Sequence, residues 1–132
     1  MARRIITGKT ADGTSVFVSD EQAPELTLAL IPGTVVTSIW SSETIPVSGT
    51  DGALPDCPTY FPPPGGLRYG LWTFPPDESA GTLSPDFDIV GALAELEAKF
   101  PGMAAHLEPD APGMHTTQTV DIGLVLSGEI DL

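Results

Sequence analysis

The segment GMHTTQTVDIGLVLSGEIDL, residues 113–132, carries the clearest structural signal in this sequence. Between Thr119 and Leu126 it is rich in β-branched and aliphatic residues, which favour strands. The Ser-Gly pair at positions 127 and 128 is a turn signal, and a second run begins directly after it. We therefore predict a β-hairpin at this end of the sequence.

The second strand of this predicted hairpin has barely begun where the sequence stops at Leu132. The second strand is too short a partner for the apolar first strand. We therefore predict that residues 1–132 are a single domain that forms the N-terminal part of a longer barrel. The alternative is a short chain that completes its sheet with a second subunit.

The rest of the sequence indicates a mainly β fold with one short helix at about residues 88–100. The helix is predicted from an N-terminal Asp88 and an apolar stripe, and Pro101 and Gly102 end it. The stripe comprises Ile89, Leu93, Leu96 and Phe100. The strand candidates, chosen by composition and turn signals, are Arg3 to Thr7, Thr14 to Ser19, Thr34 to Ser41 and Leu67 to Phe74.

A long loop is predicted over residues 43–66, which hold six prolines and four glycines and show no strand or helix period. Two interpretations stay open. A loop of this length on a small domain often covers a ligand cavity, or it is a passive surface excursion.

Charge and composition exclude several classes of protein. The net charge of −13 argues against nucleic-acid binding, which needs a cationic surface, and against anionic lipid. Neither a signal peptide nor a membrane-spanning run is predicted. A single cysteine, Cys57, fits a reducing compartment, so we expect a cytoplasmic protein.

The stretch from Gly113 to Gly128 resembles the first metal-binding motif of the cupin superfamily. His115 occupies the position of the first histidine, Asp121 that of the glutamate, and Gly128 follows Asp121 after six intervening residues. The chain is also similar to small single-domain cupins in its Arg-Arg-Ile-Ile-Thr-Gly start and its Gly-Met-His-x-Thr-x-Thr-x-Asp segment. The resemblance implies a cupin-like jelly-roll β-barrel that lacks the C-terminal second motif.

The same resemblance implies a divalent transition metal, Fe, Mn, Ni or Zn, with His115 and Asp121 as its ligands and as catalytic residues. Two departures weaken this expectation. Thr117 occupies the position of the second histidine, and Asp121 replaces the longer glutamate. Asp121 is also expected to pair with His115 or with a basic group from elsewhere in the chain, and a pair with His115 can do acid–base chemistry without a metal.

Three further residues are candidates for binding a small molecule: Thr117 beside the motif, and Trp72 and Arg68 on a predicted strand. The strand aromatics, Trp40, Tyr69, Trp72 and Phe74, are expected to lie in the core or to line a cavity, most of them in the core. His106 is expected on the surface, because its spacing from His115 matches no local metal pattern.

Two functions follow as hypotheses. The first is a cupin enzyme of the dioxygenase, decarboxylase or isomerase type that acts on a small organic molecule in the barrel cavity. The second is a non-catalytic small-ligand-binding module, or a structural protein, with a degenerate metal site. In either case a homodimer is expected, because an incomplete hairpin leaves an exposed sheet edge.

Overall fold

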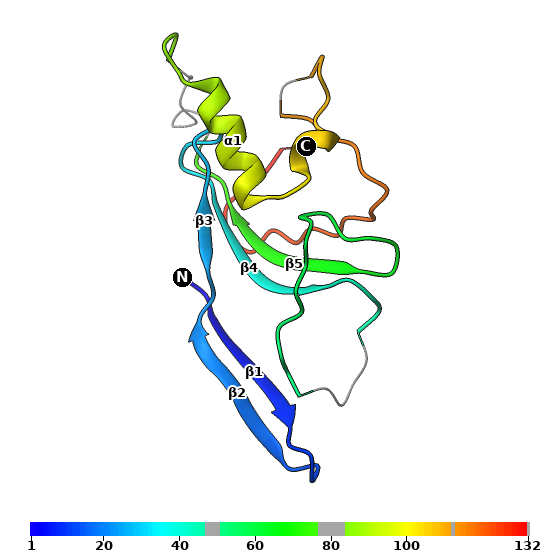
Figure 1. Cartoon of the computed structure of the whole chain (residues 1–132). Coiled ribbons are helices and arrows are strands. Elements are labelled where there is room, and N and C mark those ends of the chain that lie inside the picture. Colours follow the sequence, from blue (N-terminus) through cyan, green and yellow to red (C-terminus); the bar gives the residue numbers. More distant parts are fainter. Residues whose placement is uncertain (47–50, 77–83, 112, 132) are drawn as a thin grey trace.

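A computed structural model describes residues 1–46, 51–76, 84–111 and 113–131 of the chain. These residues form five β-strands, one α-helix and a short 3-10 helix, which confirms the prediction of a mainly β fold with one helix. The strands belong to a two-stranded and a three-stranded antiparallel sheet (Figure 1). No closed barrel is formed by the described residues, so the cupin jelly roll remains a prediction.

The two-stranded sheet is a hairpin that projects from the rest of the molecule like an arm (Figure 1). It consists of β1 (Arg3–Lys9) and β2 (Ser15–Gln22), whose pairing confirms the predicted strands on either side of the Asp-Gly turn. Gly13 has a φ of 86°, a left-handed conformation that glycine adopts without steric cost. Phe17 is 77% exposed, whereas Ile6 is buried, so only some of the apolar side chains of the arm are shielded from solvent.

The three-stranded sheet has β4 (Val35–Ser42) at its centre, between β3 (Glu25–Thr27) and β5 (Leu67–Thr73). The β-branched composition of β4 suits a central strand, because branched side chains pack well on a pleated surface. Val36 in β4 pairs with Trp72 in β5, and this register places the two side chains on the same face of the sheet. β5 lies at one edge of the sheet.

The predicted helix is confirmed as α1 (Ile89–Lys99), and the 3-10 helix η2 (Met103–His106) follows it. The Asp88 carboxylate accepts a hydrogen bond from the backbone N–H of Gly91 at 2.9 Å and so caps the first turn. In the described part of the chain no helix is long and apolar enough to cross a membrane.

The core lies between one face of the three-stranded sheet and the end of α1 (Figure 1). Its buried members are Leu28, Val36, Leu96, Phe100 and Met103. The predicted apolar stripe is buried only in its second half, because Ile89 and Leu93 at the start of α1 remain exposed. A core this small depends strongly on Phe100, the one large side chain that is fully buried among the described residues.

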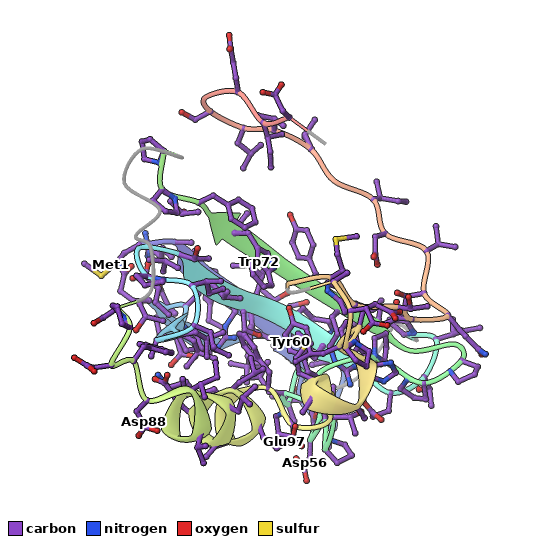
Figure 2. The ribbon with its side chains drawn as sticks, turned by 90° about the horizontal axis from the view of Figure 1, so that it is seen from above. Met1, Asp56, Tyr60, Trp72, Asp88 and Glu97 are labelled. Carbon is purple, nitrogen blue, oxygen red and sulfur yellow. The ribbon has the colours of Figure 1, made fainter. Side chains whose placement is uncertain are left out.

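The prediction of a hairpin at the end of the sequence is wrong for this chain. Residues 119–131 contain no strand, and their apolar side chains lie in solvent, with Ile122 94% exposed and Leu124 82% exposed. A strand is stabilised by backbone hydrogen bonds to a neighbour, and the few residues after the turn are too short to supply them. We refer to residues 117–131 as the C-terminal segment, which extends from the body as an open stretch of chain (Figure 2).

The predicted loop over residues 43–66 holds neither helix nor strand in its described parts, 43–46 and 51–66. Residues 47–50 of this loop lie outside the described residues. Its two ends lie against the strands β4 and β5, and its second half returns toward the core.

Candidate functional site

The loop before β5 is fastened to the sheet by the guanidinium of Arg68. Its five N–H groups make five hydrogen bonds, to the carboxylate of Glu43 and to the carbonyl oxygens of Ser42, Thr59, Tyr60 and Leu67. The sequence predicts a ligand-binding role for Arg68. Because an arginine has five N–H donors in total, none is left for the carboxylate of a ligand, and Arg68 positions the loop instead.

Five aromatic side chains gather where this loop, β5 and the end of α1 meet. We call Tyr60, Phe61, Trp72, Phe74 and Phe100 the aromatic shelf. The ring of Tyr60 lies 4.4 Å from that of Phe100 and 5.0 Å from that of Phe61, measured between centroids. Trp72 stacks on Phe74 at 5.7 Å, with an angle of 20° between the rings. In Figure 2 Trp72 lies above Tyr60, and both lie below the open stretch of chain at the top of the view.

Trp72 and Phe74 face the core side of the sheet, yet both remain accessible. Trp72 shares this face with its cross-strand partner Val36, which is buried. Trp72 is nevertheless 41% exposed and Phe74 54% exposed, because the core cluster does not extend over them. The expectation that the strand aromatics lie mostly in the core is wrong for these two side chains and for Tyr69, which is also exposed. An accessible pair of stacked rings offers a flat apolar surface to a ligand.

Two histidines lie on the Phe61 side of the shelf. The ring centroid of His106 lies 4.8 Å from that of Phe61, and the ring centroid of His115 lies 5.4 Å from it. An isolated antiparallel β-bridge between Leu107 and His115 joins the two chain segments that carry these histidines. The Nδ1 atom of His106 also lies 3.0 Å from the carbonyl oxygen of Thr116, so the hydrogen on this nitrogen is donated to that carbonyl. His106 is therefore part of the site and only partly exposed.

A row of alternate polar side chains follows along the C-terminal segment. Thr119 donates from Oγ1 to the Asp121 carboxylate at 3.1 Å. Because that hydroxyl has one hydrogen, Thr119 accepts in its 2.7 Å hydrogen bond with Thr117, whose hydroxyl is the donor. Among the described residues, the hydrogen bond of the Asp121 side chain comes from Thr119, and the pairing of Asp121 with His115 stays a prediction.

The hydroxyl of Tyr60 connects the shelf to Asp121. Burial raises the pKa of Tyr60 to about 12, and the negative charge of the Asp121 carboxylate acts in the same direction. A hydrogen bond with the Trp72 side chain acts in the opposite direction. Tyr60 therefore stays a neutral phenol at neutral pH, with Trp72 on one side and a carboxylate within Coulombic reach.

The transition-metal site that the resemblance implies stays a prediction. Among the described residues, no three histidine, cysteine, aspartate or glutamate side chains come together as possible ligands. A catalytic metal normally takes three ligands from the protein. Among the described residues, no hydrogen bond or ion pair is seen between His115 and Asp121, the two predicted ligands. We therefore derive no chemical step through a metal.

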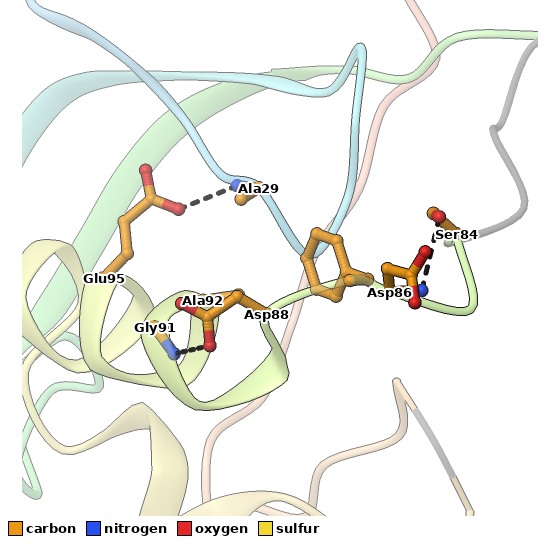
Figure 3. A pocket seen from close by; sticks show the side chains of 8 residues that line it. Ala29, Ser84, Asp86, Asp88, Gly91, Ala92 and Glu95 are labelled. Atoms are coloured by element: carbon orange, nitrogen blue, oxygen red, sulfur yellow. Dashed lines mark hydrogen bonds between the residues drawn. The ribbon is translucent and has the colours of Figure 1, made fainter.

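A second, open depression of about 590 Å³ lies at the start of α1, lined in part by Asp86, Asp88 and Glu95 (Figure 3). Two of these three carboxylates, those of Asp88 and Glu95, already have structural partners. Asp88 caps the helix, and Glu95 accepts a hydrogen bond from the backbone N–H of Ala29 at 2.8 Å and binds the Lys99 ammonium at 2.6 Å. We assign this depression to the framework of the fold.

Sequence reasoning predicted Trp72, His115, Thr117 and Asp121 as site residues, which stays a prediction, and it did not predict the ring contacts of Tyr60, Phe61 and Phe74. The adjacent aromatics Tyr60 and Phe61 in a loop of prolines and glycines were the available signal, because a loop rarely keeps two bulky rings without a surface to pack on. Their contact with Phe100 and the histidines depends on tertiary structure alone.

Neither the protein-family models nor the curated proteins or solved structures gave a match to this chain. The similarity to cupins therefore depends on the motif residues of the sequence.

Proposed function

We propose that this protein is a cupin-like domain that binds a small organic molecule on the aromatic shelf, without catalysis. The accessible stacked pair of Trp72 and Phe74 is the observation that carries the proposal. Binding sites for small molecules combine apolar, aromatic surfaces with a few polar groups that orient the ligand. Here Tyr60, His115 and the row ending at Asp121 are the polar groups around the rings.

The proposal is tested by two-dimensional NMR of isotope-labelled protein, read at the indole N–H signals. The sequence has two tryptophans, Trp72 on the shelf and Trp40 on β4, so the second signal is an internal control. Titration with benzyl alcohol, benzyltrimethylammonium and phenylacetate should shift the Trp72 signal saturably and leave the Trp40 signal in place. If none of the three probes moves the Trp72 signal, shelf binding is refuted.

The alternative is a metal-dependent enzyme of the dioxygenase, decarboxylase or isomerase type, which the spacing of His115 and Asp121 favours. It requires the two side chains to bind one ion together. Metal analysis after loading with Fe, Mn, Ni or Zn distinguishes the two functions. Stoichiometric metal that is lost in a His115→Ala variant would favour the enzyme over the binding module.

We also propose that two copies of the chain associate through the C-terminal segment. Val120, Ile122, Leu124 and Leu126 alternate along it and are all exposed, which is the pattern of a strand with one buried face. β5 lies at a sheet edge and has backbone groups available for a further strand. Multi-angle light scattering that gives a monomer mass at micromolar concentration would contradict this proposal.

A further inference from the structure

Tyr60 is held in one position beside Trp72 by contacts of its backbone and of its ring. Its backbone N–H donates to the carbonyl of Pro101 at 2.8 Å, and its carbonyl accepts from Nε of Arg68 at 2.9 Å. Its ring centroid lies 4.4 Å from that of Phe100, and the centroid of Trp72 lies 6.3 Å from that of the same Phe100. The two side chains therefore share a neighbour, and a hydrogen bond joins them to each other.

The chemistry of the two groups gives the direction of this hydrogen bond. The indole Nε1 of Trp72 is only a donor, so the hydroxyl oxygen of Tyr60 accepts. The phenol has one hydrogen of its own, and among the described residues no side chain or carbonyl accepts it. Tyr60 is only partly buried, so this hydrogen is available to an acceptor from outside the chain.

The position of this hydroxyl relates it to the accessible ring faces of the shelf. Trp72 is 41% exposed and stacks on Phe74. Because the Tyr60 oxygen is bonded to the edge of the indole, a flat molecule stacked on Trp72 has its own rim within hydrogen-bonding reach of the hydroxyl. The shelf thus combines an apolar face with one hydrogen-bond donor at its border.

The surroundings of Trp72 are uncharged. Among the described residues, its ring contacts and its hydrogen bond are with Tyr60, Phe74 and Phe100. None of these carries a charge at neutral pH, so neither a cation nor an anion stacked on Trp72 meets an opposite charge in direct contact with the indole.

The side chains that can carry a positive charge contact other parts of this region. The rings of His106 and His115 lie against Phe61, at 4.8 Å and 5.4 Å between centroids. All five N–H groups of Arg68 are used by the loop. The net charge of −13 also opposes the approach of an anion. The hydroxyl of Tyr60 is therefore the polar group that a molecule on Trp72 meets first.

We propose that the ligand of the aromatic shelf is an uncharged molecule with a flat apolar body and an oxygen acceptor, of the aryl ketone, ester or ether class, which stacks on Trp72 and accepts a hydrogen bond from Tyr60. This inference deepens the proposed function and rests on it. Stacking on the indole supplies apolar contact, and the hydrogen bond fixes the orientation of the ligand.

The test compares acetophenone, which has a carbonyl oxygen, with toluene, which has the ring without an acceptor, in the NMR titration. Tyr60→Phe removes the hydroxyl and keeps the ring that packs on Phe100. We expect this variant to bind acetophenone about threefold to tenfold more weakly than the unmodified chain does, and toluene with unchanged affinity. Tyr69→Phe, at the other tyrosine of the sequence, is the matched control and should lose affinity for neither probe.

The hydrogen bond itself is tested without any ligand. Tyr60→Phe removes the acceptor of the Trp72 indole N–H, so the signal of this N–H should move, whereas Tyr69→Phe should leave it in place. An unchanged Trp40 signal shows that the sheet is intact in both variants. If the Trp72 signal does not respond to Tyr60→Phe, the hydroxyl does not lie at the indole edge and the inference is overturned.

The outcomes separate this inference from the proposed function. Shifts of the Trp72 signal with both probes, but equal effects of Tyr60→Phe on acetophenone and toluene, would overturn the hydrogen bond and leave shelf binding in place. Tighter binding of phenylacetate or benzyltrimethylammonium than of acetophenone would overturn the uncharged class, and a preference for phenylacetate that is lost in His115→Ala would assign recognition to the histidine. Absence of any shift at Trp72 with every probe would overturn the proposed function itself.

Discussion

The guanidinium of Arg68 and the backbone of Tyr60 are joined by a hydrogen bond of 2.9 Å from Nε to the carbonyl oxygen. The residue at the start of an edge strand therefore holds the loop that brings the aromatic shelf together. The loop has no strand or helix of its own in its described residues, so its conformation depends on this side chain and on the backbone hydrogen bond from Tyr60 to Pro101.

The first prediction concerns Arg68→Met. Removal of the guanidinium leaves a partly buried Glu43 carboxylate and several carbonyl groups without their donor, so the free energy of unfolding should fall by about 2–4 kcal/mol. Urea denaturation measures it. Arg3→Met is the matched control, because the ion pair of Arg3 with Asp20 is largely exposed to solvent and its loss should cost much less stability. Equal losses in both variants would contradict the positioning role.

The second prediction concerns the core. Phe100 is 2% exposed and contacts both Tyr60 and Trp72 through its ring. Phe100→Ala should destabilise the fold by about 3–5 kcal/mol, since it leaves a cavity under the shelf. Leu93→Ala on the exposed side of α1 should cost less than about 1 kcal/mol. A small effect of Phe100→Ala in thermal or urea unfolding would show that the core cluster is assigned wrongly.

The comparison of sequence and structure shows what local patterns determine here. The helix was predictable because residues next to its two ends in the sequence show where it begins and ends. Asp88 caps its start, and Phe100 caps its end. The hairpin at the end of the sequence was predicted wrongly. Strand composition such as that of residues 119–126 specifies a strand only where a neighbouring strand is present to pair with it.

The candidate site was predictable to the same limited degree. His115, Thr117 and Asp121 form a local motif, and the ring of His115 lies beside Phe61 of the shelf. Arg68 was misassigned, because its five acceptors come from residues up to 26 positions away and no local pattern shows them. The approach of His106 to Phe61 is likewise a tertiary contact.

The third prediction concerns self-association through the C-terminal segment. The double variant Ile122→Lys and Leu124→Lys places two charges on the apolar face of the proposed interface, where they cannot be desolvated cheaply. We expect the variant to be monomeric at concentrations where the unmodified chain is dimeric, measured by light scattering. Ser127→Lys together with Glu129→Lys adds charge on the same segment away from these side chains, and this control should stay dimeric.

The fourth prediction concerns the stability of the fold at high pH. Tyr60 has its pKa raised from the ordinary value of 10 to about 12, so the folded state keeps its proton where the unfolded state loses it. The stabilisation is complete below pH 10 and is lost as the pH rises toward 12. Between about pH 8 and about pH 11 the free energy of unfolding should fall by about 1 kcal/mol more than in Tyr60→Phe, after solvent screening of this partly buried group.

The same titration tests the link between Tyr60 and Asp121 directly. The sequence has two tyrosines, so in a Tyr69→Phe background the ultraviolet absorption of tyrosinate reports Tyr60 alone. Because the Asp121 charge helps to raise the pKa of Tyr60, Asp121→Asn should lower that pKa, whereas Asp131→Asn should leave it in place. An unchanged Tyr60 pKa in Asp121→Asn would contradict an electrostatic effect of Asp121 on the Tyr60 hydroxyl.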